Sequence, residues 1–305
     1  MKEFPSCFGE NGIQIDHPSL SNTNKTNAQN RVTCVYSYDS FRFSGFITVT
    51  WIKHLVAQGL TIGIENPSKQ PLCRVHIKPW LFSSKKKGFK NLVVNSTTVN
   101  IHWDLSSAKF GSSPEPLQNF YLAIVLNQEL CLLLGDSPNE AYKKIDSVST
   151  PVVTKAKFVA KREHIVGKRL YTSKAQFCEK GELHDIWIEY DPSEGFGKCL
   201  VICIDRKVVL QVTQLMWKFR GNETILVDGF SVEVYWDVYN WLFGSVNMSN
   251  AIFLFRSCVS GEKLWSNVSP NKPSALSWNG WERSKDVDLQ QGHGFSLVLC
   301  AWKNE

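Results

Sequence analysis

The chain has 305 residues, of which 43% are hydrophobic and 20% are charged, so it can bury a core in one large or two ordinary domains. This balance excludes a chain that is disordered throughout. The net charge of +6 permits an anionic partner such as nucleic acid or a lipid headgroup, but does not require one.

The sequence also indicates where in the cell the protein is located. Pro5 interrupts the N-terminus before an apolar signal segment can form, and no apolar run reaches the roughly 18 residues of a membrane span. The nine cysteines are odd in number and contain no Cys-x-x-Cys pair, which is typical of buried free thiols. We therefore predict no transmembrane segment and a cytoplasmic or nuclear location.

In chain order, residues 1–30 are rich in Asn, Ser and Thr and lack periodicity, so a disordered tail is predicted. Short alternating segments follow from Arg31 onward, separated by turn signals such as Asp228-Gly229. Helical signals are limited to a short surface helix over Pro138–Ile145 and one turn over Ser106–Phe110. The pattern predicts an all-β fold of antiparallel, sandwich- or barrel-like sheets with few short helical turns.

An internal repeat organises these segments. Val99–Gly111 (VNIHWDLSSAKFG) returns in degenerate form as Val232–Gly244 (VEVYWDVYNWLFG), with a Trp-Asp pair at the same place in both. Further matches keep the same order: Ile47–Trp51 with Asp185–Glu189, Leu60–Glu65 with Leu200–Asp205, and Asn119–Ile124 with Asn250–Phe255. We predict two tandem repeats, residues 31–150 and 151–305, forming either two separate structures or one merged structure.

Several of these motifs resemble a known plant family. They are Trp103–Gly111 with Pro114-Glu115-Pro116, Arg162-Glu163-His164, Trp217–Asn222, Val227-Asp228-Gly229 and Trp236-Asp237-Val238. The chain is similar over about Arg31 to Lys303 to the plant family filed as domain of unknown function 868. The resemblance implies a plant protein. It carries no established activity, so it assigns no catalytic residue.

Two aspartates at matching places are the best candidate catalytic pair. If Asp104 and Asp237 faced one cleft, they could act as paired carboxylates in a hydrolase-like enzyme on a carbohydrate or another polar substrate. The alternative is that each carboxylate caps its own turn, which the local sequence favours. His102 and the serines near Asp104 lack the Gly-x-Ser-x-Gly pattern of a hydrolase nucleophile, so we interpret them as structural.

A run of basic residues is the main candidate for binding an anion. Its members are Lys155, Lys157, Lys161, Arg162, Lys168, Arg169 and Lys174. On a strand pair, alternation would place several of them on one face, which would attract the phosphates of nucleic acid or of lipid headgroups. The alternative is a solvated sheet edge that lysines protect from unwanted pairing.

An aromatic turn is the second candidate surface. Trp241 and Phe243 lie where the first repeat has Ala108 and Phe110, and at an exposed turn they would form a patch for a partner or a membrane surface. The alternative is that the turn is buried. Because the histidines form no metal-binding pattern and no phosphate-binding glycine loop occurs, no metal and no cofactor are predicted. The preferred function is a non-enzymatic binding or scaffold module.

Overall fold

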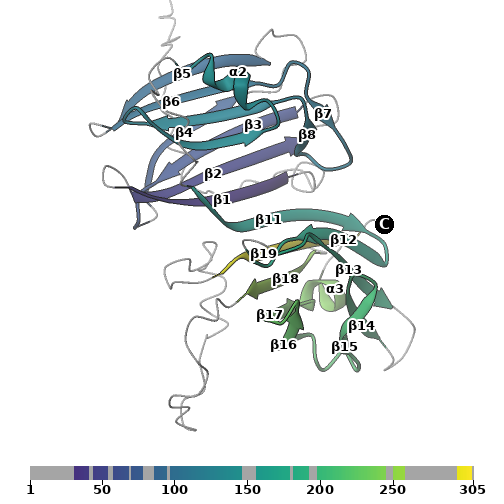
Figure 1. Cartoon of the computed structure of the whole chain (residues 1–305). Coiled ribbons are helices and arrows are strands. Elements are labelled where there is room, and N and C mark those ends of the chain that lie inside the picture. The colour runs from purple at the N-terminus through teal and green to yellow at the C-terminus, as the bar shows by residue number, and fades with distance from the viewer. Residues whose placement is uncertain are drawn as a thin grey trace, which may run out of the picture. The chain divides into compact units, whose positions relative to one another are not determined.

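Strands dominate the part of the chain that the structure describes. The computed structural model describes residues 31–40, 44–53, 58–68, 70–77, 86–94, 97–145, 156–178, 181–191, 198–244, 250–257 and 294–303. Within these residues the chain forms nineteen strands and two short helices, α2 and α3 (Figure 1). The predicted all-β fold is confirmed. The predicted tail, residues 1–30, lies outside the described residues.

The described residues divide into two compact units. The first unit contains residues 38–156, and the second contains residues 31–37 and 157–303. The first strand, β1 (Arg31–Asp39), therefore belongs to the second unit over most of its length. The predicted boundary between residues 150 and 151 lies outside the described residues.

The first unit consists of two sheets, a two-stranded ribbon and one helix. Its elements are β2 (Ser44–Lys53), β3 (Gln58–Glu65), β4 (Pro71–Ile77), β5 (Lys87–Val94), β6 (Thr97–Asp104), β7 (Lys109–Phe110), β8 (Pro116–Gln118), β9 (Tyr121–Leu126), β10 (Glu129–Gly135) and α2 (Pro138–Tyr142). One sheet contains β2, β3 and β4 as neighbours in that order, the other sheet has the order β10-β9-β6-β5, and β7 pairs with β8.

Alternation along the strands defines the core of the first unit. Every second residue is buried in β2 from Ile47 to Trp51 and in β6 from Val99 to Trp103, because successive side chains point to opposite faces. β9 is buried at all six positions, since α2 covers the face that points away from this core.

Two sequence-based helix predictions have different outcomes. The short helix predicted over Pro138–Ile145 is confirmed as α2, in which Ala141 is buried. The helical turn predicted over Ser106–Phe110 is wrong. Ser106 and Ser107 form a turn, and Lys109–Phe110 becomes β7, because pairing with β8 satisfies its backbone groups.

The second unit also contains two sheets and one helix. Its elements, besides β1, are β11 (Lys157–Gly167), β12 (Leu170–Ala175), β13 (His184–Asp191), β14 (Cys199–Ile204), β15 (Lys207–Val212), β16 (Arg220–Val227), β17 (Phe230–Asp237), α3 (Tyr239–Phe243), β18 (Asn250–Ser257) and β19 (Ser296–Lys303). One sheet has the order β12-β13-β14-β15, and the other contains β16-β17-β18-β19-β11-β1. β11 and β19 pair in parallel, which departs from the predicted antiparallel arrangement.

A single hydrophobic core holds the two sheets of the second unit together. Ile188 and Ile202 from one sheet and Val234, Phe253 and Leu299 from the other belong to the same buried cluster. These side chains are fully buried, so the two sheets form a sandwich whose inner faces interdigitate.

In the first unit, the Trp-Asp pair ends β6 with one residue facing inward and the next facing outward. Trp103 lies opposite Gly88 of β5, and a Cβ atom at Gly88 would meet its indole ring. The Asp104 carboxylate accepts a hydrogen bond from the Ser106 N–H at 3.0 Å and forms an ion pair with Lys87 at 2.6 Å.

In the second unit, the same arrangement ends β17. Trp236 lies opposite Gly221 of β16, where a Cβ atom would again meet the indole ring. The Asp237 carboxylate accepts hydrogen bonds from the Tyr239 N–H at 3.0 Å and from Arg220 Nε at 3.0 Å. A glycine is required in both places because the indole occupies the space of a side chain.

The strand registers refine the sequence match between the two repeats. Ile47 pairs with Ile64, and Ile186 pairs with Ile204. Ile47 therefore corresponds to Ile186, one residue away from the match with Asp185 that the sequence indicated. The difference matters because a shift of one residue exchanges the two faces of a strand. A duplication explains these parallels, and it stays a prediction.

Gly221→Ala tests the space beside Trp236. The added methyl group must displace the buried indole, so we expect the free energy of unfolding to fall by about 1–3 kcal/mol. Chemical denaturation measures this change. Asn222→Ala, at the next and exposed position of β16, is the matched control and should stay within about 0.5 kcal/mol of the unaltered chain. Equal stability of the two variants would contradict the packing argument.

A buried histidine links the start of β13 to two turns of the second unit. His184 begins β13 and is 5% exposed. Its Nδ1 lies 2.6 Å from Asp205 in the turn before β15, and its Nε2 lies 2.9 Å from Asp228 in the turn before β17. Because β13 and β17 belong to different sheets, the imidazole joins the two layers. Burial opposes its charge, but the two carboxylates outweigh burial and raise the pKa of His184.

The raised pKa of His184 predicts a pH-dependent stability. Since the folded-state pKa exceeds the unfolded value of about 6.5, the contribution is complete below that pH and is lost as pH rises through the folded-state pKa. We expect His184→Gln to lower the free energy of unfolding by about 1–3 kcal/mol at pH near 6, and by less in alkaline solution.

The pH dependence is measured by denaturation of both chains across neutral and alkaline pH. His76→Gln, on the exposed face of β4, is the control and should show no such trend. A difference between His184→Gln and the unaltered chain that stays constant with pH would contradict a charged His184.

Candidate functional site

The outward face of the β5–β6 hairpin carries the candidate site. Because Trp103 and Gly88 face the core, their neighbours on the two strands face outward. Phe89 lies opposite His102 with ring centroids 4.6 Å apart, and Asn91 lies opposite Asn100. Phe89 is 56% exposed, so the hairpin presents an aromatic surface to solvent.

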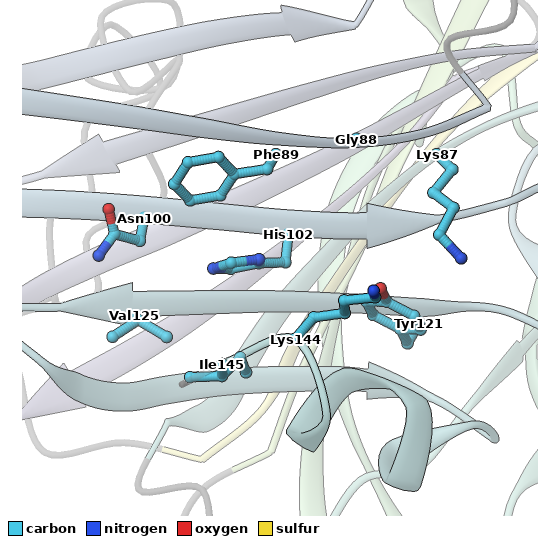
Figure 2. Close-up of a pocket in the computed structure, with 9 residues that line it drawn as sticks. All are labelled: Lys87, Gly88, Phe89, Asn100, His102, Tyr121, Val125, Lys144 and Ile145. Atoms are coloured by element: carbon cyan, nitrogen blue, oxygen red, sulfur yellow. The ribbon is translucent and has the colours of Figure 1, made fainter. Parts of the chain in front are cut away.

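A groove of about 490 Å³ lies over this face. Its lining comes from β5, β6, β9 and the residues that follow α2, and consists of Lys87, Gly88, Phe89, Asn100, His102, Tyr121, Val125, Lys144 and Ile145. Figure 2 shows Phe89, His102, Asn100, Val125 and Ile145 toward one end, and Lys87, Tyr121 and Lys144 toward the other. The groove is therefore largely aromatic and aliphatic at one end and cationic at the other, within the size range of small-molecule sites.

The charges at the cationic end do not cancel completely. Lys87 is paired with Asp104, and Lys143 is paired with Glu140 at 2.7 Å. Lys144 has no ion pair within the described residues, so one positive charge remains beside the groove. Burial opposes ionisation of Asp104, yet the hydrogen bonds from Lys87 and Ser106 outweigh burial and lower its pKa.

Tyr121 contributes a neutral hydroxyl at the same end. Burial, together with the negative charge of Asp104, raises the pKa of its phenol. The phenol therefore keeps its proton at neutral pH and can donate or accept a hydrogen bond.

A buried carbonyl without a partner marks the other end of the groove. The side-chain oxygen Oδ1 of Asn100 is buried and has no hydrogen-bond partner within the described residues. A buried polar atom of this kind costs free energy unless a donor reaches it. A ligand with an N–H or O–H group would satisfy it.

The corresponding place in the second unit is filled by the chain itself. Counted from the Trp-Asp pair, Glu233 takes the position of Asn100, and Arg256 lies opposite it where the first unit has Val125. Arg256 Nη2 donates to Glu233 at 2.6 Å and to the Tyr235 hydroxyl at 3.2 Å. The polar group is thus satisfied internally in the second unit, whereas in the first unit it has no hydrogen-bond partner within the described residues.

The two predicted catalytic aspartates have local partners in the structure. Asp104 belongs to the first unit and Asp237 to the second, and each carboxylate binds a cation of the adjacent strand and a backbone N–H of the following turn. These are the interactions of a structural cap. Their joint action as a catalytic pair stays a prediction.

The predicted basic face is divided by the alternation of β11. Lys161 points inward with Glu163, which it approaches at 3.3 Å, whereas the intervening Arg162 points to the opposite face. Lys174 is paired with Asp185 at 3.0 Å. Among the other members of the run, Lys157, Lys168 and Arg169 are exposed, and Lys155 lies outside the described residues.

The two residues of the aromatic turn have different surroundings. Trp241 is buried in the core, stacks on Tyr171 at 4.8 Å and donates its Nε1–H to the Ala301 carbonyl at 3.1 Å. Phe243 is 45% exposed and lies against Phe219 and Tyr239 with centroid distances of 5.7 and 5.1 Å. Trp241 thus anchors α3, and Phe243 contributes to the surface.

Sequence reasoning missed Phe89, Asn100 and Lys144 as residues of one site. Alternation around Trp103 was the signal that could have placed Phe89 and Asn100 on the outward face, once the β5–β6 register was known. Lys144 carried no local signal, because its position depends on how α2 packs on β9 and β10.

The comparisons with known proteins show the family and no activity. Residues 27–303 match the family described as plant protein of unknown function (DUF868). The chain belongs to this family. No curated protein and no solved structure matches the chain. This family membership agrees with the resemblance carried by the Trp-Asp motifs.

Two features are absent from the part of the chain that the structure describes. No helix in this part of the chain is both long and apolar enough to cross a membrane. The described ranges also contain no cluster of three or more His, Cys, Asp or Glu side chains arranged to hold a metal ion.

Asp104→Asn tests whether this carboxylate is a structural cap. The amide can still accept the Ser106 N–H but loses the ion pair with Lys87, so we expect a loss of about 0.5–1 kcal/mol in unfolding free energy. Denaturation in low and high salt measures it, and the loss should shrink in high salt. Asp136→Asn, whose carboxylate binds only backbone N–H groups and Ser137, is the control without a lysine partner. A salt-independent loss would contradict the ion pair.

Proposed function

We propose that this protein is a non-enzymatic binding module whose first unit holds a small aromatic anion in the groove over β5, β6 and β9. The observation that carries the proposal is the polarity of the groove, which has aromatic walls, an unneutralised Lys144 at one end and the unpaired Asn100 carbonyl at the other. The ligand class that fits is an aromatic carboxylate, sulfonate or phosphate with a hydrogen-bond donor on the ring.

Each chemical group of this ligand would contact a different part of the groove. A planar ring would lie against the Phe89–His102 pair and Val125, which removes exposed apolar surface from water. An anionic group would approach Lys144 and Lys87, and the ring donor would satisfy Asn100. A binding role agrees with the predicted module, and the cytoplasmic or nuclear location stays a prediction.

Lys144→Ala tests the anion preference. Loss of one unneutralised charge near the ligand should weaken binding of naphthalenesulfonate about fivefold and leave uncharged naphthalenemethanol unchanged. Calorimetric titration of the full chain with both compounds measures this. Lys143→Ala is the matched control, because its charge is already bound to Glu140, and it should change neither affinity.

Phe89→Ala tests the aromatic wall in the same assay. Both naphthalene compounds should bind about tenfold more weakly, because the ring loses its stacking surface. Val93→Ala is the control, since Val93 is 71% exposed on the same strand and does not line the groove. Equal effects of Lys143→Ala and Lys144→Ala, or no effect of Phe89→Ala, would contradict binding in this groove.

A further inference from the structure

One end of the sandwich in the second unit is formed by α3 and the turns beside it. In one sheet, Gly167 at the end of β11 pairs with Lys303 at the end of β19. The other sheet ends at the same place, because Trp241 of α3 donates to the Ala301 carbonyl of β19 and stacks on Tyr171 of β12. We call this surface the α3 end. It comprises α3, the strand ends beside it, the turn 168–169, the segment 213–219 and Lys198.

Aromatic side chains are exposed at the α3 end. Phe219 contacts Tyr239 and Phe243 of α3, with ring centroids 5.6 and 5.7 Å apart. Trp217, two residues before Phe219, is 75% exposed, and Tyr239 and Phe243 are exposed as well. Leu170, the first residue of β12, adds an exposed aliphatic side chain. Apolar surface of this kind, beside polar turns, is typical of a contact surface.

The α3 end also carries an excess of positive charge. Arg220 is bound to Asp237 at 3.0 Å, whereas Lys168, Arg169 and Lys218 have no ion pair within the described residues. In this part of the chain the basic residues of the α3 end are Lys168, Arg169, Lys198, Lys218, Arg220 and Lys303, and the acidic ones are Asp191 and Asp237.

Two of these lysines lie close to the aromatic side chains. Lys198 accepts the N–H of Leu215 with its carbonyl at 3.1 Å, which places it beside the segment that carries Trp217. Lys303 Nζ donates to the Trp241 carbonyl at 2.9 Å. Burial lowers the pKa of Lys303, and the charge of Lys198 lowers it further. The two ammonium groups therefore repel one another, and an anionic partner would relieve this repulsion.

The opposite end of the same sandwich has acidic residues beside its cations. The turn between β14 and β15 is Asp205-Arg206, and the turn between β16 and β17 is Asp228-Gly229. Lys174 of β12 is paired with Asp185 at 3.0 Å. The excess of cations at the α3 end is therefore local to that end.

We propose that the α3 end docks on a membrane surface that contains anionic lipids. Aromatic side chains favour the boundary between headgroups and acyl chains, and lysine and arginine are attracted to negative headgroups. The α3 end presents both types of side chain together. This surface belongs to the second unit and uses no residue of the groove, so it stands or falls independently of the ligand proposed for the first unit.

The packing of the aromatic rings favours a membrane over a single-stranded nucleic acid. A nucleic acid would also use cations and aromatic rings, but its bases need free ring faces on which to stack. The Arg220 guanidinium lies over the rings of Phe219 and Tyr239, 5.7 and 5.3 Å from their centres. Ring edges and the aliphatic Leu170 suit the acyl boundary instead.

Co-sedimentation of the full chain with vesicles tests the charge requirement. The unaltered chain should bind vesicles of phosphatidylcholine and phosphatidylserine, mixed about three to one, at least tenfold more tightly than vesicles of phosphatidylcholine alone. Lys168→Glu combined with Arg169→Glu should weaken binding to the anionic vesicles more than tenfold, since each lost cation costs about fivefold. Arg206→Glu combined with Lys207→Glu changes the net charge equally at the opposite end, and should stay within about twofold because salt screens distant charges.

Trp217→Ser tests the apolar contact in the same assay. Its exposed indole leaves the core intact when removed, and binding to the anionic vesicles should weaken about tenfold. Phe230→Ser, at an exposed position of the opposite end, is the control and should leave binding unchanged. Equal effects of the two double variants, or no effect of Trp217→Ser, would overturn docking through the α3 end. Tighter binding of single-stranded oligothymidine than of the anionic vesicles would overturn the choice of a membrane.

Discussion

The strict alternation of faces at the end of β6 is the constraint on which the first unit depends. Trp103 must point inward against Gly88, because only a glycine leaves room for the indole on that strand. This choice fixes which residues of β5 and β6 point outward. The pairing of Phe89 with His102 and of Lys87 with Asp104 is a consequence of the same register. A core requirement therefore positions the walls of the groove.

In both units a Trp-Asp pair ends a strand, Trp103-Asp104 in β6 and Trp236-Asp237 in β17, and we call this feature the corner. The residues around the corner differ between the two units. Asp104 binds Lys87, and Asp237 binds Arg220, so the corner is closed by the same type of ion pair. In the second unit, the guanidinium of Arg220 also lies 5.3 Å from the centre of the Tyr239 ring, which covers the corner with aromatic side chains. Since the inward residues are constrained by packing, the outward residues are where the two units can differ.

The sequence was sufficient for most strands and for α2, but it predicted a helical turn where β7 forms, and it was insufficient for the sites. Period-two alternation predicted the strands, and the Trp-Asp motif located equivalent corners in both halves. The run from Lys155 to Lys174 shows why composition failed as a guide to a surface, because neighbours such as Lys161 and Arg162 point to opposite faces of β11. Lys168 and Trp217 lie at the same end of the second unit only through the pairing of strands that are distant in sequence, and no local pattern reports such a pairing.

Unsatisfied groups carry more functional information in this fold than charged residues do. Several charges of the sheets are paired across strands, as in Lys174 with Asp185, and such exposed pairs contribute little to binding or stability. A buried carbonyl without a donor is different, because no hydrogen bond within the chain offsets the free energy of its desolvation. The second unit shows that the chain can remove this cost by placing an arginine opposite, as Arg256 does for Glu233. In the first unit, Val125 lies opposite Asn100 and cannot donate a hydrogen bond, and a groove large enough for a small molecule lies beside it. This is the strongest structural reason to expect that an external donor binds the Asn100 carbonyl.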